Sequence, residues 1–513
     1  MKFINYSNKS SQRGGLMIQA LVFGSISVVI IGALISWAGI NIKASRVALY
    51  REQALQIAEA GIDYYRWHLA HAPTDYQDGT GVAGPYVHDF FDKDGIKIGE
   101  YSLEIVPPQL GFTLVKIRST GTVLVDPSVS RTIETGLAIP SLAKYAIASN
   151  NDIRFGEGTE VFGPIHSNGG IRFDGLAHNL VTSSRTSYDD PDHNGAVEFG
   201  VHTHLNTPPT SVNDTFRANE APPTNPVPNR TDVFVAGRSF PVPAIDFLGF
   251  TTDLAQIKTD AQASGRYFAS SGALGYRILL KTDDTFDLYR VNNLTTAGGS
   301  CTETATGWGT WSIRTTGGSQ TFLANYSIPA NGLVFVEDHV WVEGQINSAR
   351  ITIAAGRFPD NAATRPNIMV NNNLLYTNYD GQDVISLISQ GNITTGLSSA
   401  NTLRIDAALV AQNGRVGRFH YSSNCGTGYQ RTQLTLYGMV ASNLRYGFAY
   451  TDGTGYDARD IIYDANLLYG PPLLELEPAR PFTSKMISLK PPASLLELET
   501  MCTVQPFTSA YLP

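Results

Sequence analysis

The chain has 513 residues, 42% of them hydrophobic and 16% charged, and a formal net charge of −8. This composition excludes wholesale disorder, and at about 150 residues per domain the length predicts roughly three structural units. The acidic balance excludes a globally basic surface, so no nucleic-acid partner is expected. The 48 Gly, 24 Tyr and 23 Phe residues favour short strands joined by turns.

A long uncharged segment lies near the N-terminus. No charged residue occurs from 16 to 42, whereas a helix needs only about 20 residues to cross the hydrocarbon core of a membrane. Apolar and small residues continue at three- and four-residue steps beyond it, and the first proline is Pro73. The pattern predicts one membrane-spanning helix that continues past the membrane and occupies 15–72.

The residues just before this segment carry a more specific pattern, because Gly14 and Gly15 follow a short basic stretch and Gln19 lies in the first apolar turn. The arrangement resembles that of prepilins, in which a leader ending in Gly precedes an apolar helix with Glu at its fifth mature position. The resemblance implies a leader at 1–14, removed after Gly14 by the prepilin peptidase. It also implies that the neutral Gln19 weakens docking to the amine of a neighbouring subunit, as suits a minor or filament-end subunit.

Further along the expected helix, the sequence Ala58-Glu59-Ala60-Gly61 resembles the corresponding segment of PilX-type minor pilins and their large pseudopilin relatives. The resemblance covers about 10–75. It implies that these four residues and Gln19 belong to a helix that packs against other pilins in a filament. An ordinary amphipathic helix behind an uncleaved signal anchor is the alternative.

The region 73–140 alternates apolar and polar residues, which predicts an antiparallel sheet packed on the helix, as in pilin heads. Asp92, Asp94 and Gly95 resemble half of a calcium-binding loop, but Phe90 and Tyr101 stand where the first and twelfth ligands would be. A plain turn is therefore favoured over a calcium site.

A degenerate repeat follows, in which a branched apolar residue, a polar turn with Asn or Gln and a new strand start recur. It predicts a right-handed parallel β-helix with coils from 141–185 and 332–470, in which Asn side chains at equivalent turns hydrogen-bond along the stack. A β-sandwich with similar turns is the alternative. The copies lie at Ile165–Ile171, Ile388–Ile393, Val410–Val416 and Val440–Tyr446.

The stretch 186–331 is expected to be an inserted subdomain that opens with a Pro-rich segment, and 471–513 is expected to be a C-terminal extension. Projecting insertions on solenoids often bind ligands. Tyr289, Trp308 and Trp311 could therefore form a glycan- or surface-binding face, although half-buried strand aromatics are the commoner case.

Three cysteines lie beyond the membrane segment, where oxidation is allowed. Cys301 and Cys425 occur in loop-like sequence and could bridge the insertion to the β-helix. Three thiols leave one unpaired, and the sequence leaves open which two form the bridge. His202-Thr203-His204 and 189–193 resemble metal ligands only loosely. They are interpreted as solvated loop residues, and no metal site is expected.

No set of carboxylates recurs at equivalent repeat positions, and the common catalytic motifs are missing from the sequence, so no catalytic residue and no cofactor are expected. The hypothesis is a non-enzymatic minor or tip subunit of a type IV pilus or related secretion filament. It would be anchored in the inner membrane with an extracytoplasmic head, would assemble with other pilins and could reach the cell surface. The alternative is an uncleaved membrane-anchored β-helix that binds or degrades envelope polysaccharide.

Overall fold

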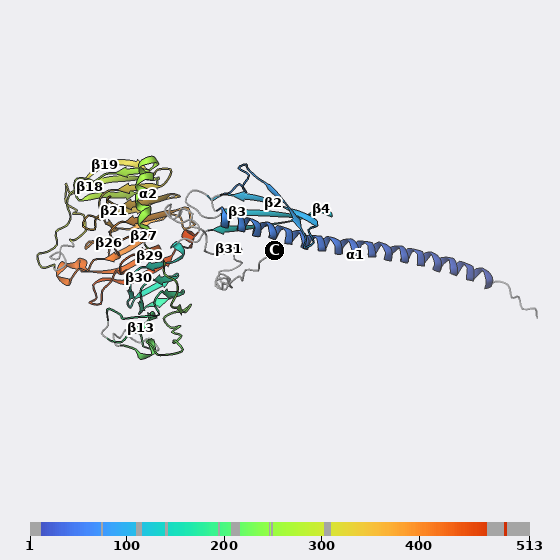
Figure 1. Cartoon of the computed structure of the whole chain (residues 1–513), viewed down its shortest axis with the longest axis horizontal. Helices are drawn as coiled ribbons and strands as arrows, with labels where there is room; N and C mark the ends of the chain where they lie inside the picture. Colours follow the sequence, from blue (N-terminus) through green and yellow to red (C-terminus); the bar gives the residue numbers. More distant parts are fainter. Residues whose placement is uncertain are drawn as a thin grey trace, which may run out of the picture. The chain divides into compact units, whose positions relative to one another are not determined.

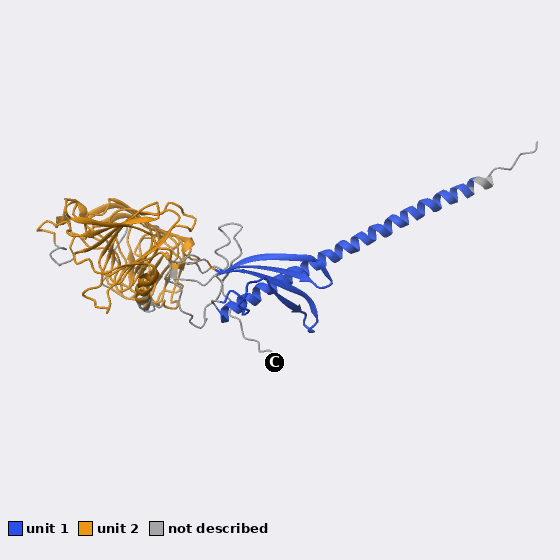
Figure 2. Cartoon of the chain, turned by 90° about the horizontal axis from the view of Figure 1, so that it is seen from above, with its two compact units in different colours: residues 1–107, 115–137, 481–513 blue, residues 108–114, 138–480 orange. Residues whose placement is uncertain are grey.

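The computed structural model describes residues 12–72, 75–108, 115–138, 142–192, 195–206, 216–245, 247, 250–301, 309–468 and 487–489. The chain divides into two compact units (Figure 2). Unit 1 comprises 1–107, 115–137 and 481–513, and unit 2 comprises 108–114 and 138–480. The large unit is thus inserted in the sequence of the small one. Most of the expected leader and of the C-terminal extension lies outside the described residues.

Unit 1 begins with a single helix, α1 (Gln12–His71), which is drawn in blue in Figure 1. From Met17 onward it contains an 18-residue window of mean hydropathy 2.4, none of which is buried. By length and composition the helix can cross a membrane, and it continues without a break into the head. The predicted long apolar helix is therefore confirmed.

The later turns of α1 cover one face of an antiparallel sheet. The strands Lys97–Val106 and Val115–Val123 alternate between more and less buried side chains, as expected for a sheet with one face on the core. Leu103 and Ile117 from the sheet meet Ile57 and Tyr65 from the helix in this core. The sheet order is β1 (Tyr86–Phe91), β2 (Lys97–Val106), β3 (Val115–Val123), β4 (Asp126–Ala138) and β31 (Ile487–Leu489).

The helix lies unusually close to the middle of this sheet, because small residues face each other there. A Cβ added to Gly121 of β3 would lie 2.2 Å from the carbonyl oxygen of Ala54 and 2.5 Å from the amide nitrogen of Ala58. On the helix side, a Cβ on Gly61 would lie 2.4 Å from Ser119 Oγ. Only glycine fits at these contacts, since a side chain at either glycine would overlap its neighbour.

Unit 2 is built mainly from parallel strands that pair in register from coil to coil, which confirms the predicted large parallel sheet. Parallel pairing excludes the β-sandwich alternative. Side chains from successive coils form one continuous apolar core, with Ile353, Leu387, Leu409 and Val440 at its centre. The strands are β5 (Ile147–Ser149), β6 (Ile153–Phe155), β7 (Thr159–Phe162), β8 (Ile165–Ser167), β9 (Ile171–Phe173), β10 (Leu176–Ala177), β11 (Val181–Ser183), β12 (Ser187–Tyr188), β13 (Glu198–Phe199), β14 (Val201–His202), β15 (Arg238–Ser239), β16 (Arg266–Phe268), β17 (Gly275–Leu280), β18 (Thr285–Val291), β19 (Gln320–Ser327), β20 (Leu333–Val336), β21 (Val340–Gln345), β22 (Arg350–Ala355), β23 (Ile368–Met369), β24 (Leu374–Leu375), β25 (Val384–Ser389), β26 (Ile393–Thr395), β27 (Thr402–Ala411), β28 (Val416–Arg418), β29 (Gln430–Ser442) and β30 (Gly455–Tyr463).

The order of coils in the stack differs from their order in the chain. From β20 the stack runs through β22, β25, β27 and β29, and β29 then pairs with β5 in the register Val440↔Ile147. It continues through β8 and β11 to β15. Two separate stretches of chain therefore form one solenoid. In Figure 1 the strands labelled β21, β27, β29, β30 and β13 follow one another from top to bottom.

Asparagine side chains connect the coils where the two stretches meet. Asn150 Nδ2 donates to Asn443 Oδ1 at 2.8 Å, and Asn168 Nδ2 donates to Asn150 Oδ1 at 2.8 Å. These residues occupy equivalent turns of three successive coils. The ladder satisfies amide groups that would otherwise compete with the strand pairing.

The predicted inserted subdomain at 186–331 is wrong as a separate body. The strand β16 pairs in parallel with β20, and β17 pairs in parallel with β21, so 266–280 supplies the first coil of the stack. Helix α2 (Phe250–Ser264) packs Leu254 and Ile257 against Phe335 on the flank of the coils. The strands β17, β18 and β19 pair antiparallel with one another and so extend the sheet as a meander. Alternating apolar residues in 266–291 are compatible with either pairing, which is why the sequence did not distinguish them.

Candidate functional sites: the anchor helix and a buried polar cluster

The first candidate site is the apolar part of α1. Gly15 and Gln19 lie exposed on this helix, and Gly14 lies in its first turns. Large apolar side chains around the helix are equally exposed, including Leu21 at 72% and Trp37 at 66%. Exposed apolar surface of this extent needs lipid or other helices to cover it.

The second part of the helix pattern, Ala58-Glu59-Ala60-Gly61, divides between two faces. Ala58 and Gly61 are buried against β3 of the same chain, Ala60 is half-buried and Glu59 is exposed. The small residues are thus explained by packing within unit 1. Of the four, Glu59 is the residue that remains open to a neighbouring molecule.

Cys301 and Cys425 form a disulfide that joins positions 124 residues apart in the chain. Both sulfur atoms are buried with Leu397 and Tyr421 in a small apolar cluster. Cys502 and Trp308 lie outside the described residues. Trp311 lies outside the strands, is half-buried and stacks on Phe419 with ring centroids 6.1 Å apart.

The second candidate site is a buried polar cluster on the outer face of the solenoid. The strands β6, β9 and β14 form a small parallel sheet in which Arg154, Arg172 and His202 occupy the same position of successive coils. Their neighbours Phe155 and Phe173 point into the apolar core. Because side chains alternate along a strand, the two arginines and the histidine point away from that core.

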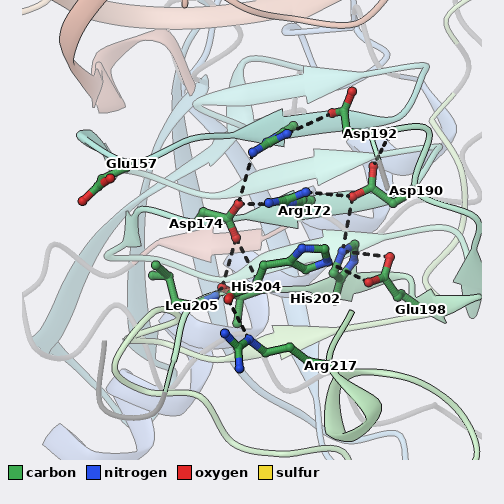
Figure 3. Close-up of polar contacts among 12 residues, drawn as sticks. Glu157, Arg172, Asp174, Asp190, Asp192, Glu198, His202, His204, Leu205 and Arg217 are labelled. Atoms are coloured by element: carbon green, nitrogen blue, oxygen red, sulfur yellow. Dashed lines mark hydrogen bonds and ion pairs between the residues drawn. The ribbon is translucent and has the colours of Figure 1, made fainter. Parts of the chain in front are cut away.

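A hairpin covers this row. The strands β12 and β13 pair antiparallel in the register Tyr188↔Glu198 and close a loop that contains Asp190. Asp190 and Glu198 point from this hairpin toward His202 and His204 (Figure 3). Glu198, His202 and His204 are fully buried and Asp190 is 3% exposed.

Two acidic residues anchor the arginine beneath the histidines. Arg172 Nε donates to Asp174 Oδ2 at 2.7 Å, and its Nη1 lies 3.5 Å from Asp190 Oδ2. Asp174 Oδ1 also accepts from the backbone N–H of His204 at 2.8 Å. Asp174 therefore fixes the chain at His204 while it neutralises the buried guanidinium.

Four potential metal ligands converge beside this anchor. One ligand atom from each of Asp190, Glu198, His202 and His204 lies within 4.8 Å of the other three. His204 Nε2 is 2.7 Å from Glu198 Oε1, and His202 Nε2 is 3.3 Å from Glu198 Oε2 and 3.7 Å from Asp190 Oδ2. Among the described residues, neither ring nitrogen of His202 has a hydrogen-bond partner.

Electrostatics keep the loop carboxylate charged. Burial alone would raise the pKa of Asp190, but the adjacent His202 ring, the backbone N–H of Asp192 and the charge of Arg172 lower this pKa well below its usual value. The carboxylate therefore remains ionised in the folded chain. Two buried carboxylates next to two imidazoles are a donor set for a cation.

The interpretation of His202 and His204 as solvated loop residues is therefore wrong. The hairpin that covers them depends on strand pairing, and His193, which belonged to the same motif, lies outside the described residues. A signal was nevertheless present in the sequence. Ile-Arg-Phe occurs at 153–155 and again at 171–173, and this repeat marks equivalent coil positions with a polar residue on the outer face.

No protein-family model matches the chain, and no curated protein matches it. Among solved structures, the chain is similar to the competence-associated pilin ComZ from Thermus thermophilus. The two are 14% identical, and the likeness covers 86% of this chain and 97% of that one with a TM-score of 0.30. A TM-score this low indicates a weak similarity, so the functional argument is made from the chain's own residues.

Proposed function

We propose that the chain is a non-enzymatic minor or tip subunit of a type IV pilus or a related secretion filament, cut after Gly14 by the prepilin peptidase. The observation that carries the proposal is the single helix α1. Its first part is uncharged and exposes mostly apolar and small side chains, and its later part packs on one face of an antiparallel sheet. Before assembly the inner membrane would cover the apolar part, and in a filament the helices of other pilins would cover it.

The arrangement of the head supports a low copy number. Unit 2 contains most of the chain, and its sequence is inserted within that of the sheet-bearing unit 1. A head of that size is difficult to repeat at every position of a dense helical filament. The neutral Gln19 points the same way, because a subunit that lacks the usual Glu has a weaker contact with the preceding subunit. The head would then face the exterior, where a glycan or other surface ligand is the expected partner.

N-terminal sequencing of the membrane-extracted protein tests the proposal. Cleavage after Gly14 gives a mature chain that begins Gly15-Leu16-Met17. The variant Gly14→Ala is expected to leave the leader attached, so the protein stays in the membrane fraction and is lost from sheared filaments. Gly24→Ala is the matched control, because a Cβ at Gly24 meets no atom within 4 Å.

Three results would contradict the proposal. The first is a wild-type chain that begins at Met1 or near Asn41, which would favour the uncleaved, polysaccharide-binding alternative. The second is a Gly14→Ala chain that still enters filaments at the wild-type level. Release of reducing or unsaturated sugar ends from envelope glycans by the purified chain would contradict its assignment as a non-enzyme.

A further inference from the structure

We propose that Asp190, Glu198, His202 and His204 bind one divalent transition-metal ion of the Zn²⁺ class, which fastens the strands β12 and β13 to the end coils of the solenoid. The site would be structural. It is independent of the proposed pilin role, since it lies entirely in unit 2.

The geometry suits a single ion. Ligands at about 2.1 Å from a tetrahedral centre lie about 3.4 Å from one another. The distances from His202 Nε2 to Glu198 Oε2 and to Asp190 Oδ2 are 3.3 and 3.7 Å. The widest separation in the set of four ligand atoms is 4.8 Å, so small side-chain rotations would bring all four atoms onto one ion.

The buried atoms without hydrogen-bond partners also favour a bound cation. Glu198 is fully buried, its nearest charged or titratable partners are the two histidine rings, and its Oε2 accepts no hydrogen bond from a described residue. The buried His202 ring likewise has no hydrogen-bond partner there. Buried polar atoms without partners are costly and rare. A divalent ion would use both sets of atoms and would balance the charge of Glu198, whereas Asp190 also faces Arg172.

The ligand types narrow the choice of ion. Two imidazoles with two carboxylates suit Zn²⁺ and its first-row neighbours, whereas Ca²⁺ and Mg²⁺ prefer oxygen ligands alone. Four protein ligands, all buried, describe a closed structural site and not a catalytic one with an open position. Asp174 supports the set from outside, because it holds the backbone N–H of His204 and the guanidinium of Arg172.

Metal analysis of the full-length chain in detergent is the test. After chelation and dialysis against Zn²⁺, we expect about one ion per chain and a higher melting temperature for unit 2. Co²⁺ in place of Zn²⁺ should give the intense visible absorption of tetrahedral coordination. Uptake below about a tenth of an ion per chain for Zn²⁺, Co²⁺ and Ni²⁺ would overturn the proposal.

Variants assign the site to these residues. Glu198→Gln and His202→Gln preserve approximate size, and each should lower metal affinity by at least about tenfold and remove the melting shift. His178→Gln is the matched control, because His178 is half-exposed and pairs with Glu160 elsewhere on the solenoid. If both cluster variants fail to fold, the Co²⁺ spectrum of the wild type decides. Wild-type uptake and spectrum retained in a folded His202→Gln chain would place the ion elsewhere and overturn the assignment.

Discussion

The two units build their cores in different ways. In unit 1 a single helix covers one face of an antiparallel sheet, and the contact depends on a few small residues such as Gly121 and Ala58. In unit 2 each coil is covered by the next coil. Polar side chains also connect the coils, as in the asparagine ladder through Asn150 and the buried row through Arg172. The stability of unit 1 should therefore depend on side-chain size at the contact between α1 and the sheet. The stability of unit 2 should depend on bonds between segments that lie far apart in the chain.

The largest expected effect comes from removing the long-range connection in unit 2. Cys301→Ser should lower the stability of that unit by about 2–5 kcal/mol, because the bond constrains a long loop of the unfolded chain. Thermal unfolding of the oxidised chain would show the loss in one of two transitions. Cys502→Ser is the control and should leave both transitions unchanged. An equal loss in the control would mean that a different pair of cysteines forms in solution.

The next largest effect is expected in unit 1. Gly121→Leu places a side chain where a Cβ alone would lie 2.2 Å from the Ala54 carbonyl, so the helix must move away from β3. We expect a loss of about 3 kcal/mol, confined to the unfolding of unit 1. Lys116→Ala in the same strand is the control, since Lys116 is exposed. A Gly121→Leu chain with unchanged stability would show that α1 and the sheet are not closely packed.

The smallest effect concerns the pH dependence of unit 2. Burial lowers the pKa of His339 below its usual 6.5, and the His339 Nδ1 accepts the backbone N–H of Asn367 at 2.9 Å. The unfolded chain then binds more protons than the folded one as pH falls below about 6.5, so unit 2 should lose stability in that range. His339→Gln should flatten this loss between pH 6.5 and 5, as measured by urea midpoints. An unchanged slope would show that another group controls it.

Much of this contrast could be predicted from the sequence. Three patterns can be recognised over short windows of sequence, and each is sufficient to indicate a helix, a strand or a coil. They are the uncharged segment, the alternation in 97–123 and the repeats around Asn168 and Asn443. The coil supplied by 266–280 and the burial of His202 depend on which strands pair across long stretches of chain. No local pattern says which distant strands pair. The repeated Ile-Arg-Phe at 153–155 and 171–173 marks only the positions that share a face.

The join between β29 and β5 has a consequence for biogenesis. The coils that contain 147–239 are synthesised early, but their neighbour at one end of the stack is 430–463. Until that late segment emerges, β5 and β7 present open parallel edges that favour wrong pairing. The early coils must therefore keep these edges protected until nearly all of unit 2 has been synthesised. Slow folding of the early coils would meet that need.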